Sequence, residues 1–389
     1  MNRERNRSTA PLGSQRHLFE IPGEVAYLNC AYMSPQLRTV RAAGEEAIVR
    51  KSRPWEISPR DFFQSSETVR ELFARVVGGD VEGVAIIPSV SYGMAVATAN
   101  IPVRAEQNVV VLAEQFPSNV YPWRELAKRE KATVVTVPRP RDHDWTTATL
   151  ERIDSRTAVV AVPNCHWTDG SMLDLTRIGK RAREVGAAFV VDATQSLGVH
   201  PLDVSGVQPD FLGSAAYKWL LGPYSLGFLY VGENYRSGTP IEHNWISREG
   251  SEDFARLIEY TDAYGPGARR YDVGERSNFV LLPMAIAALH QILSWGVENI
   301  SRTVGNLTNL IEAEAKHLGI EAVPAPMRVE HMIGFGLGPG APKDLAVRLA
   351  EDNVFVSVRG KSIRVSPHLY NTERDVERLF YSLAKHLRL

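Results

Sequence analysis

The chain has 389 residues, of which 44% are hydrophobic and 23% are charged, and its formal net charge is -1. These values are ordinary for a globular protein with a large core, and they point to neither a nucleic-acid partner nor a membrane partner. The only cysteines, Cys30 and Cys165, show no metal-ligand spacing with the histidines, so the sequence predicts no disulfide framework and no metal site.

The beginning of the chain is polar and basic. It lacks the apolar stretch of a secretory signal, and no later stretch is long and apolar enough to span a bilayer. We therefore expect a disordered start over residues 1–16 and a cytoplasmic protein.

Short β-branched runs alternate with helix-like segments between about residues 60 and 235. The runs "GVAIIPS", "NVVVLAEQ", "TAVVAVPN" and "AAFVVDATQ" are each followed by an amphipathic segment or a turn. Continuous Val, Ile and Ala runs with this spacing predict a mostly parallel sheet with helices on both faces. We expect residues 61–275 to form a large α/β, doubly wound domain.

From about residue 278 the pattern becomes helical. Apolar residues recur at helical spacing through Ala285, Leu289 and Ile292, and Gly296 is a candidate break between two helices. A strand-like "HMIGFGLG", a helix, two short strands and a last helix follow. We expect residues 276–389 to form a smaller α+β domain, with residues 17–60 packed on it.

A glycine-rich stretch, Gly336 to Ala341, fits a relaxed dinucleotide-binding fingerprint. It contains a proline and lacks the parallel βαβ unit that this fingerprint needs. We interpret it as a turn between a strand and a helix.

Polar and aromatic side chains follow the predicted strands at their carboxyl ends, where ligands bind in open α/β sheets. These segments are Ser89–Ser91, Gln115–Asn119, Asn164–Trp167, Asp192–Gln195 and Tyr217–Lys218. Together they could supply an anion site, an aromatic platform, a carboxylate, an amide and a lysine in one cleft.

Each of these residues also has a purely structural interpretation. Ser89 and Ser91 could cap a helix that begins at about Gly93, and Asp192 could cap the next helix. Lys218 could lay its stem on apolar surface with its ammonium group in water. The set as a whole favours a pyridine-ring cofactor that carries a phosphate and is bound to a lysine as a Schiff base.

The stretches "VVDATQSLGVHPLDV" and "PDFLGSAAYKWLLGPYSLGFLYV" carry a resemblance to a known family. They resemble the class V aminotransferase superfamily of pyridoxal 5'-phosphate enzymes, fold type I, with its Asp-x-x-Gln and its lysine before a Gly-Pro turn. The resemblance runs from about Tyr27 to the last helix. It implies pyridoxal 5'-phosphate as cofactor, an amino acid as substrate, and a homodimer with shared active sites.

The resemblance also implies roles for individual residues. Lys218 would form the Schiff base and move the proton at the substrate α-carbon. Asp192 would pair with the pyridinium nitrogen, and Gln195 would hydrogen-bond the ring hydroxyl. Phe116 falls where the family stacks a residue on the ring face.

Further matches concern the phosphate and the substrate. Val90 and Ser91 match the phosphate-binding loop, and Tyr217 matches the residue before the lysine, whose side chain reaches the phosphate. Arg364, in "SIRVSPHLYNTERDVERL", would bind the α-carboxylate, unless it pairs with an acid on a helix. Arg359 is a weaker candidate, structural or at the rim of the substrate site.

Two segments depart from the family pattern. The usual Gly-Thr-Pro turn, which reaches the partner subunit's phosphate, is replaced by a segment in which Ser277 or Asn278 could act instead, or which could be purely structural. The segment "VFVSVRGKS" lacks the mobile cysteine of cysteine desulfurases, so the persulfide-forming reaction is excluded.

We interpret Cys165 as an ordinary buried thiol. Trp167 falls where many desulfurases have an asparagine. An aromatic residue at this position is similar to the kynureninase-like and epimerase-like branches of the family.

The expected function is that of an aminotransferase acting at the α-carbon of an amino acid. The alternatives are a kynureninase-like or C–S lyase β-cleavage, an epimerisation, and a cofactor-binding protein without turnover. Members of the family share the bond-breaking step at the α-carbon and differ in the fate of the carbanion that this step produces.

Overall fold

A computed structural model describes residues 11–336, 338, 340–360 and 362–387. Residues 1–10 of the expected disordered start lie outside the described residues, whereas Leu12 and Gln15 donate backbone hydrogen bonds to Thr303 Oγ1 and Leu369 O, both of 2.8 Å. No single helix in the described ranges has the length and apolar character to cross a membrane. The helices Leu281–Trp295 and Val297–His317 meet that criterion only as a pair, which is bent by 76°.

The helices and strands alternate along most of the chain. The helices are α1 (Arg38–Lys51), α2 (Asp61–Val77), α3 (Val90–Asn100), α4 (Tyr121–Glu130), α5 (Trp145–Leu150), α6 (Leu175–Val185), α7 (Val204–Val207), α8 (Leu281–Trp295), α9 (Val297–His317), α10 (Leu345–Glu351) and α11 (Glu373–Leu387). The strands are β1 (Ala26–Tyr27), β2 (Val84–Ile87), β3 (Asn108–Leu112), β4 (Thr133–Val137), β5 (Thr157–Pro163), β6 (Ala188–Asp192), β7 (Phe211–Ala215), β8 (Gly227–Val231), β9 (Ile333–Gly336), β10 (Val354–Phe355), β11 (Ser357–Arg359) and β12 (Ser362–Val365).

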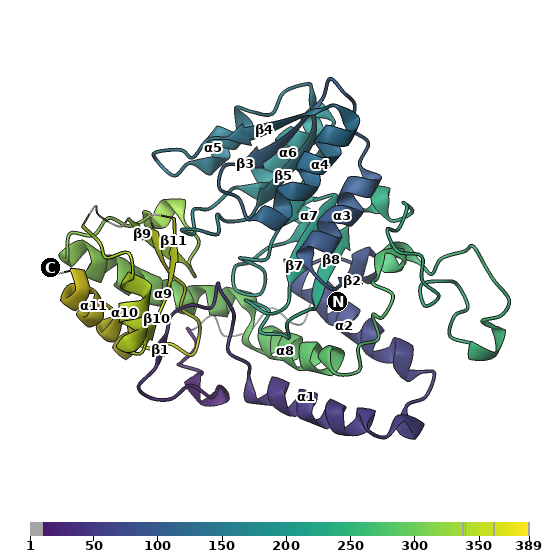
Figure 1. The fold of residues 1–389 in the computed structure, drawn as a ribbon, viewed down its shortest axis with the longest axis horizontal. Coiled ribbons are helices and arrows are strands. Elements are labelled where there is room, and N and C mark those ends of the chain that lie inside the picture. Colours follow the sequence, from purple (N-terminus) through teal and green to yellow (C-terminus); the bar gives the residue numbers. More distant parts are fainter. Residues whose placement is uncertain (1–10, 337, 339, 361, 388–389) are drawn as a thin grey trace, which may run out of the picture.

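The large sheet has seven strands in the order β2-β8-β7-β6-β5-β3-β4 (Figure 1). Only β8 runs antiparallel to its neighbours, β2 and β7, so the predicted doubly wound, mostly parallel sheet is confirmed. Successive side chains of a strand face opposite sides. Val109 and Val111 of β3 share a core with α3 and α4, and Val110 and Leu112 share the core that contains α2 and α6. Burial on both faces is why these runs are continuously apolar.

Helix α3 begins at Val90, three residues earlier than the expected start at Gly93. Ser89 has an extended backbone, and its hydroxyl accepts a hydrogen bond of 3.3 Å from the Tyr92 N–H. A serine in this geometry is an N-cap, and it decides where the helix begins. The hydroxyls of Ser89 and Ser91 therefore stand at the carboxyl end of β2.

A second, three-stranded sheet has the order β11-β12-β9, with both pairs antiparallel. Its apolar residues form a separate core with α10, α11 and the end of α9. The predicted break at Gly296 separates α8 from α9, and this glycine has a φ of 78°. In Figure 1 this sheet and its helices (yellow-green) lie beside the large sheet.

The N-terminal segment reaches both parts of the molecule. β1 pairs in parallel with β10, and α1 packs against α8. Helix α8 belongs to the core of the large sheet, and α9 contributes to both cores, with Ile300 and Val304 in one and Ile311 and Ala315 in the other. The division at residues 275 and 276 stays a prediction about how the chain separates into domains.

Candidate active site

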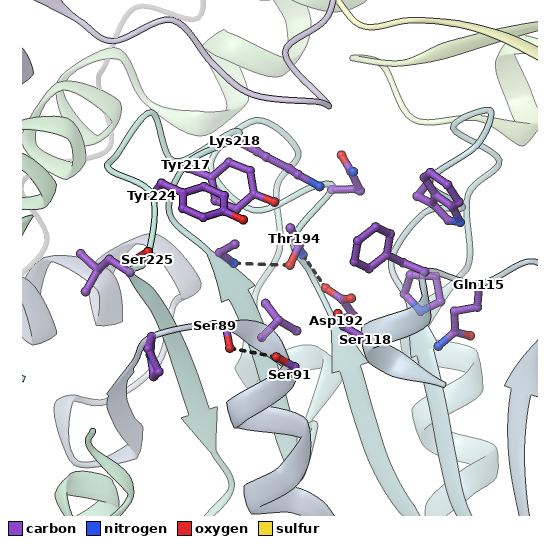
Figure 2. Close-up of a pocket in the computed structure, with 18 of the residues that line it drawn as sticks. Ser89, Ser91, Gln115, Ser118, Asp192, Thr194, Tyr217, Lys218, Tyr224 and Ser225 are labelled. Carbon is purple, nitrogen blue, oxygen red and sulfur yellow. Dashed lines mark hydrogen bonds between the residues drawn. The ribbon is translucent and has the colours of Figure 1, made fainter. Parts of the chain in front are cut away.

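A cavity of about 310 Å³ lies at the carboxyl ends of β2, β5, β6 and β7. Figure 2 shows Ser89 and Ser91 at the start of a helix, Asp192 at the end of a strand, and Lys218 above them. Seven residues predicted for the cofactor line this cavity: Val90, Ser91, Phe116, Asp192, Gln195, Tyr217 and Lys218. The topology brings them together because the ends of parallel strands meet at one edge of the sheet.

A second cavity of about 260 Å³ adjoins the first. Arg359 and Arg364 line it, together with Tyr32 and Met33 of the N-terminal segment. Lys218 lines both cavities. A group bound in the first cavity and a group bound in the second would therefore both lie beside this lysine.

Lys218 follows β7 and is buried, with 6% of its surface exposed. Its Nζ lies 5.4 Å from the centroid of the Phe116 ring and 5.5 Å from that of the Tyr217 ring. Burial lowers the pKa of Lys218 to about 8; the Arg364 charge adds to this shift and the Asp192 charge opposes it. A large fraction of the amine is therefore neutral near pH 8, and neutral amines attack aldehydes.

Asp192 ends β6 and is buried. Its Oδ1 accepts a hydrogen bond of 3.0 Å from the Thr194 N–H. Burial raises the pKa of this carboxyl, while the Thr194 bonds and the Lys218 charge lower it. The residues after Asp192 form turns, so the alternative that it caps the next helix is wrong. A buried carboxylate here is suited to a cationic ring nitrogen.

Gln195 is fixed at both ends of its amide. Its Nε2 donates to Ala31 O at 3.1 Å, and its Oε1 accepts from Trp219 Nε1 at 3.1 Å. The backbone carbonyl of Gln195 accepts from His331 Nε2 at 2.6 Å. The contact of Gln195 with a ring hydroxyl stays a prediction.

The start of α3 lines the first cavity. The Ser89 and Ser91 hydroxyl oxygens are 2.9 Å apart, and the first backbone N–H groups of a helix point outward. Tyr217 packs against Tyr224, which also lines the cavity, with ring centroids 4.5 Å apart. Hydroxyls and amides at a helix start are well suited to a phosphate.

Phe116 is not a buried core residue, because 39% of its surface is exposed. Its ring meets Trp167 edge to face at 5.4 Å, which leaves a flat surface at the cavity wall.

Arg364 lies on β12 and is 1% exposed. Its Nη1 donates to Trp167 O at 2.7 Å, and its buried Nε has no hydrogen-bond partner among the described residues. No described carboxylate lies within ion-pair distance of this guanidinium, so the alternative of a pair with a helix acid is wrong. Burial and the Arg359 charge lower the pKa of Arg364 to about 9.

Ser277 and Asn278 line another pocket of the same chain, and their contact with the partner subunit's phosphate stays a prediction. Ser277 Oγ donates to Phe62 O at 2.6 Å, and Asn278 Oδ1 accepts from the first N–H groups of α8. His166 stacks on Trp145 in the core. Cys165 lines the first cavity, but burial raises the pKa of its thiol, as expected of an unreactive one.

Sequence reasoning gave no individual role to several lining residues, among them Thr194, Tyr224, Ser225 and Tyr32. The turn Gly222-Pro223 was a signal for two of them, because it returns the chain to the cavity directly after the lysine. Ser225 has a φ of 62°, which is uncommon for a residue with a side chain.

The donor set matches a phosphorylated pyridine aldehyde in each part. The first cavity offers a lysine amine for the aldehyde, a carboxylate for the ring nitrogen, an aromatic face for the ring and hydroxyls for the phosphate. The fold and this donor set are those of a pyridoxal 5'-phosphate-dependent enzyme of fold type I.

Comparison with known proteins identifies the family. The family model for class V aminotransferases matches residues 58–379. The chain belongs to the class V aminotransferase family. It is 26% identical over 342 residues to an uncharacterized aminotransferase, YcbU, of Bacillus subtilis, covering 87% of each chain. It is also 25% identical to a cysteine desulfurase of Enterobacter sp. over 83% of this chain and 79% of the relative.

Solved structures share the fold. A cysteine desulfurase from Thermococcus onnurineus superposes with a TM-score of 0.81 at 20% identity, over 97% of this chain and 99% of that one. A cystine C–S lyase, C-DES, in complex with cysteine persulfide superposes with a TM-score of 0.84 at 17% identity, over 94% and 98% of the two chains.

Proposed function

We propose that the protein is an aminotransferase that takes the α-amino group from an amino acid with a free α-carboxylate. The observation that carries this proposal is the position of Lys218 on the wall shared by the two cavities, with Arg364 in the second one. An amino acid whose carboxylate is bound by Arg364 would have its α-carbon directed toward Lys218.

In the first cavity, we assign the binding of the cofactor to seven residues. Pyridoxal 5'-phosphate, when bound, supplies an electron sink that stabilises negative charge at the α-carbon. Lys218 holds the aldehyde and, when released, moves the proton at the α-carbon. Asp192 holds the charge of the ring nitrogen, Gln195 bonds the ring hydroxyl, and Phe116 covers the ring face. Val90, Ser91 and Tyr217 bind the phosphate.

In the second cavity, Arg364 selects the substrate. Its guanidinium is already buried and rigidly placed by the bond to Trp167 O, so it loses little entropy when it binds. A carboxylate that accepts from its Nε relieves a buried donor that otherwise lacks a partner.

The cysteines distinguish amino-group transfer from desulfurisation. No cysteine occurs between Val354 and Ser362, and both Cys30 and Cys165 are buried. A sulfur atom therefore has no exposed thiol to accept it beside Arg364. The similarity to a relative named as an aminotransferase, over 87% of each chain, favours amino-group transfer.

The test is incubation of the purified holoenzyme with a panel of amino acids, followed by absorbance and product analysis. Conversion of the cofactor to its pyridoxamine form, with release of the oxo acid, supports the proposal. Pyruvate or a thiol without that conversion indicates a C–S lyase, alanine indicates a kynureninase-like cleavage, and loss of optical purity indicates an epimerase. No spectral change with any amino acid indicates a cofactor-binding protein. The Lys218→Ala variant serves as the inactive control.

We also propose that the protein is a homodimer with shared active sites. Several large apolar side chains, Trp55, Ile258 and Tyr260, are highly exposed on the single chain, and such surface is typical of interfaces. Light scattering coupled to gel filtration tests this proposal, which predicts twice the mass of 43.2 kDa. The mass of one chain would contradict it.

A cytoplasmic location is our last proposal. Both cysteines are free thiols, which suits a reducing compartment. Fractionation of cells that produce the protein tests it, and recovery from another compartment would contradict it.

A further inference from the structure

The hairpin of β11 and β12 places two arginines on one face. Ser357 pairs with Arg364, and Arg359 pairs with Ser362. Since alternate residues of a strand share a face, Arg359 lies diagonally across from Arg364 on the same side, where side chains are still within reach of each other. The two strands are joined through Gly360, whose φ of 58° suits a tight turn.

The cavity between these arginines and Lys218 is lined by three basic side chains and by no aspartate or glutamate of the described residues. The other lining residues are aromatic, apolar or neutral. One α-carboxylate bound by Arg364 neutralises only one of the guanidinium charges. A second positive charge in a partly buried cavity is costly unless it too is paired.

Arg359 has no acidic partner within the described part of the chain. It is half-buried, its Nη1 donates to the carbonyl of the preceding residue, Val358, at 2.9 Å, and its guanidinium carbon lies 5.7 Å from the Trp167 ring. These contacts orient the group, but they occupy few of its five N–H donors. A planar fork held in this way is preorganised for a carboxylate.

We propose that Arg359 binds a second anionic group, carried by the substrate side chain, so that the preferred substrate is an amino acid with a side-chain carboxylate. This inference rests on the proposed function, in which Arg364 holds the α-carboxylate. The aromatic walls of Phe116, Trp167 and Tyr32 then line the apolar part of the side chain between the two charged ends.

The experiment compares matched pairs of substrates that differ only in the charge of the side chain. The pairs are aspartate with asparagine and glutamate with glutamine. The kcat/KM of each is measured with wild-type holoenzyme, with Arg359→Leu and Arg359→Lys, and with Arg348→Leu as a matched control. Arg348 is an exposed arginine of α10 that pairs with Asp344, and it does not line the cavity.

In at least one pair, the wild type should prefer the carboxylate member by about tenfold or more, as expected for a charge-assisted hydrogen bond. Arg359→Leu should abolish the preference, mainly through KM, and leave the neutral member within about threefold. Arg359→Lys should keep part of the preference, and Arg348→Leu all of it.

Two results would overturn the inference alone. They are equal losses for both members of each pair in Arg359→Leu, and a wild type that reacts with amino acids but prefers no carboxylate member. If no amino acid changes the cofactor absorbance of the wild type, the proposed function itself fails, and the inference fails with it.

Discussion

Two groups of buried cations differ in how their charge is satisfied. Behind the large sheet, Arg70 donates through Nη2 to Asp272 Oδ2 at 2.8 Å and through Nη1 to Oδ1 at 3.2 Å, and Arg276 lies 3.1 Å from the same carboxylate. In the cavities, Lys218 and Arg364 are also buried, but no described carboxylate lies within ion-pair distance of either.

The difference separates structural charges from charges placed for a ligand. Asp272 also accepts from the Ile86 N–H at 2.7 Å, so the first group has a carboxylate of its own within the chain, and that carboxylate ties β2 to the segment before α8. The second group has no such carboxylate among the described residues, as we expect of cations that bind an anionic ligand. A buried cation without a partner costs stability, and such a cost is a common mark of a functional site.

The largest expected effect is that of Lys218→Ala. Loss of the amine removes the covalent anchor and the group that moves the proton, so turnover should fall by about a thousandfold or more. The visible absorbance of the bound cofactor should disappear with it. Steady-state kinetics and absorbance spectra check this, and turnover close to the wild-type rate would contradict the role of Lys218.

Asp272→Ala should destabilise the protein by removing the carboxylate that Arg70 and Arg276 share. It leaves Arg276 buried without its carboxylate and leaves Arg70 with only the Glu67 carboxylate, 3.3 Å from its Nε, which should lower the free energy of unfolding by about 3–5 kcal/mol. Chemical denaturation measures this loss. An unchanged denaturation midpoint would show that the charges of this group are solvated in another way.

Arg364→Met should have the opposite effect, a loss of activity without a loss of stability. It removes a buried charge that the chain itself does not pair, so stability should be unchanged or higher, while kcat/KM should fall by about a hundredfold through loss of the carboxylate contact. Thermal unfolding and kinetics on the same preparations check both parts. A large loss of stability would place Arg364 with the structural group.

A smaller effect concerns pH. Because the neutral amine attacks the aldehyde and the pKa of Lys218 is about 8, binding of pyridoxal 5'-phosphate to the cofactor-free protein should slow as the pH falls through about 8. Arg364→Met removes one of the charges that lower this pKa, so the midpoint should move to higher pH. Stopped-flow absorbance measures it, with Arg348→Met as control. A midpoint unchanged by Arg364→Met would contradict the coupling.

Much of the large sheet could be predicted from the sequence, because strands such as β5 and β6 are buried on both faces and must be apolar throughout. The proximity of Asp192, Gln195 and Lys218 follows from the same reasoning, since the ends of neighbouring strands meet. The interpretation of Ser89 as a helix cap is confirmed, but α3 begins at Val90 and not near Gly93, because the first helical residue directly follows the cap.

Other features depend on contacts between distant segments. β1 has two residues, too few to show any periodicity, and its partner β10 lies more than 300 residues away. The face of the hairpin on which Arg359 lies depends on the register of β11 and β12, and the sequence does not show this register. Asp272 directly follows the short 3-10 helix Gly267–Tyr271. So short an element shows no apolar periodicity from which the burial of Asp272 could be predicted.

The most direct test of the central claim compares an amino acid with the amine that lacks only its α-carboxylate. The cofactor absorbance of the holoenzyme is titrated with both compounds, in the wild type and in Arg364→Met. We predict that the wild type responds to the amino acid at concentrations about a hundredfold lower than to the amine, and that Arg364→Met loses this preference. A preference that survives in Arg364→Met would contradict the claim that Arg364 is held unpaired to bind the substrate carboxylate.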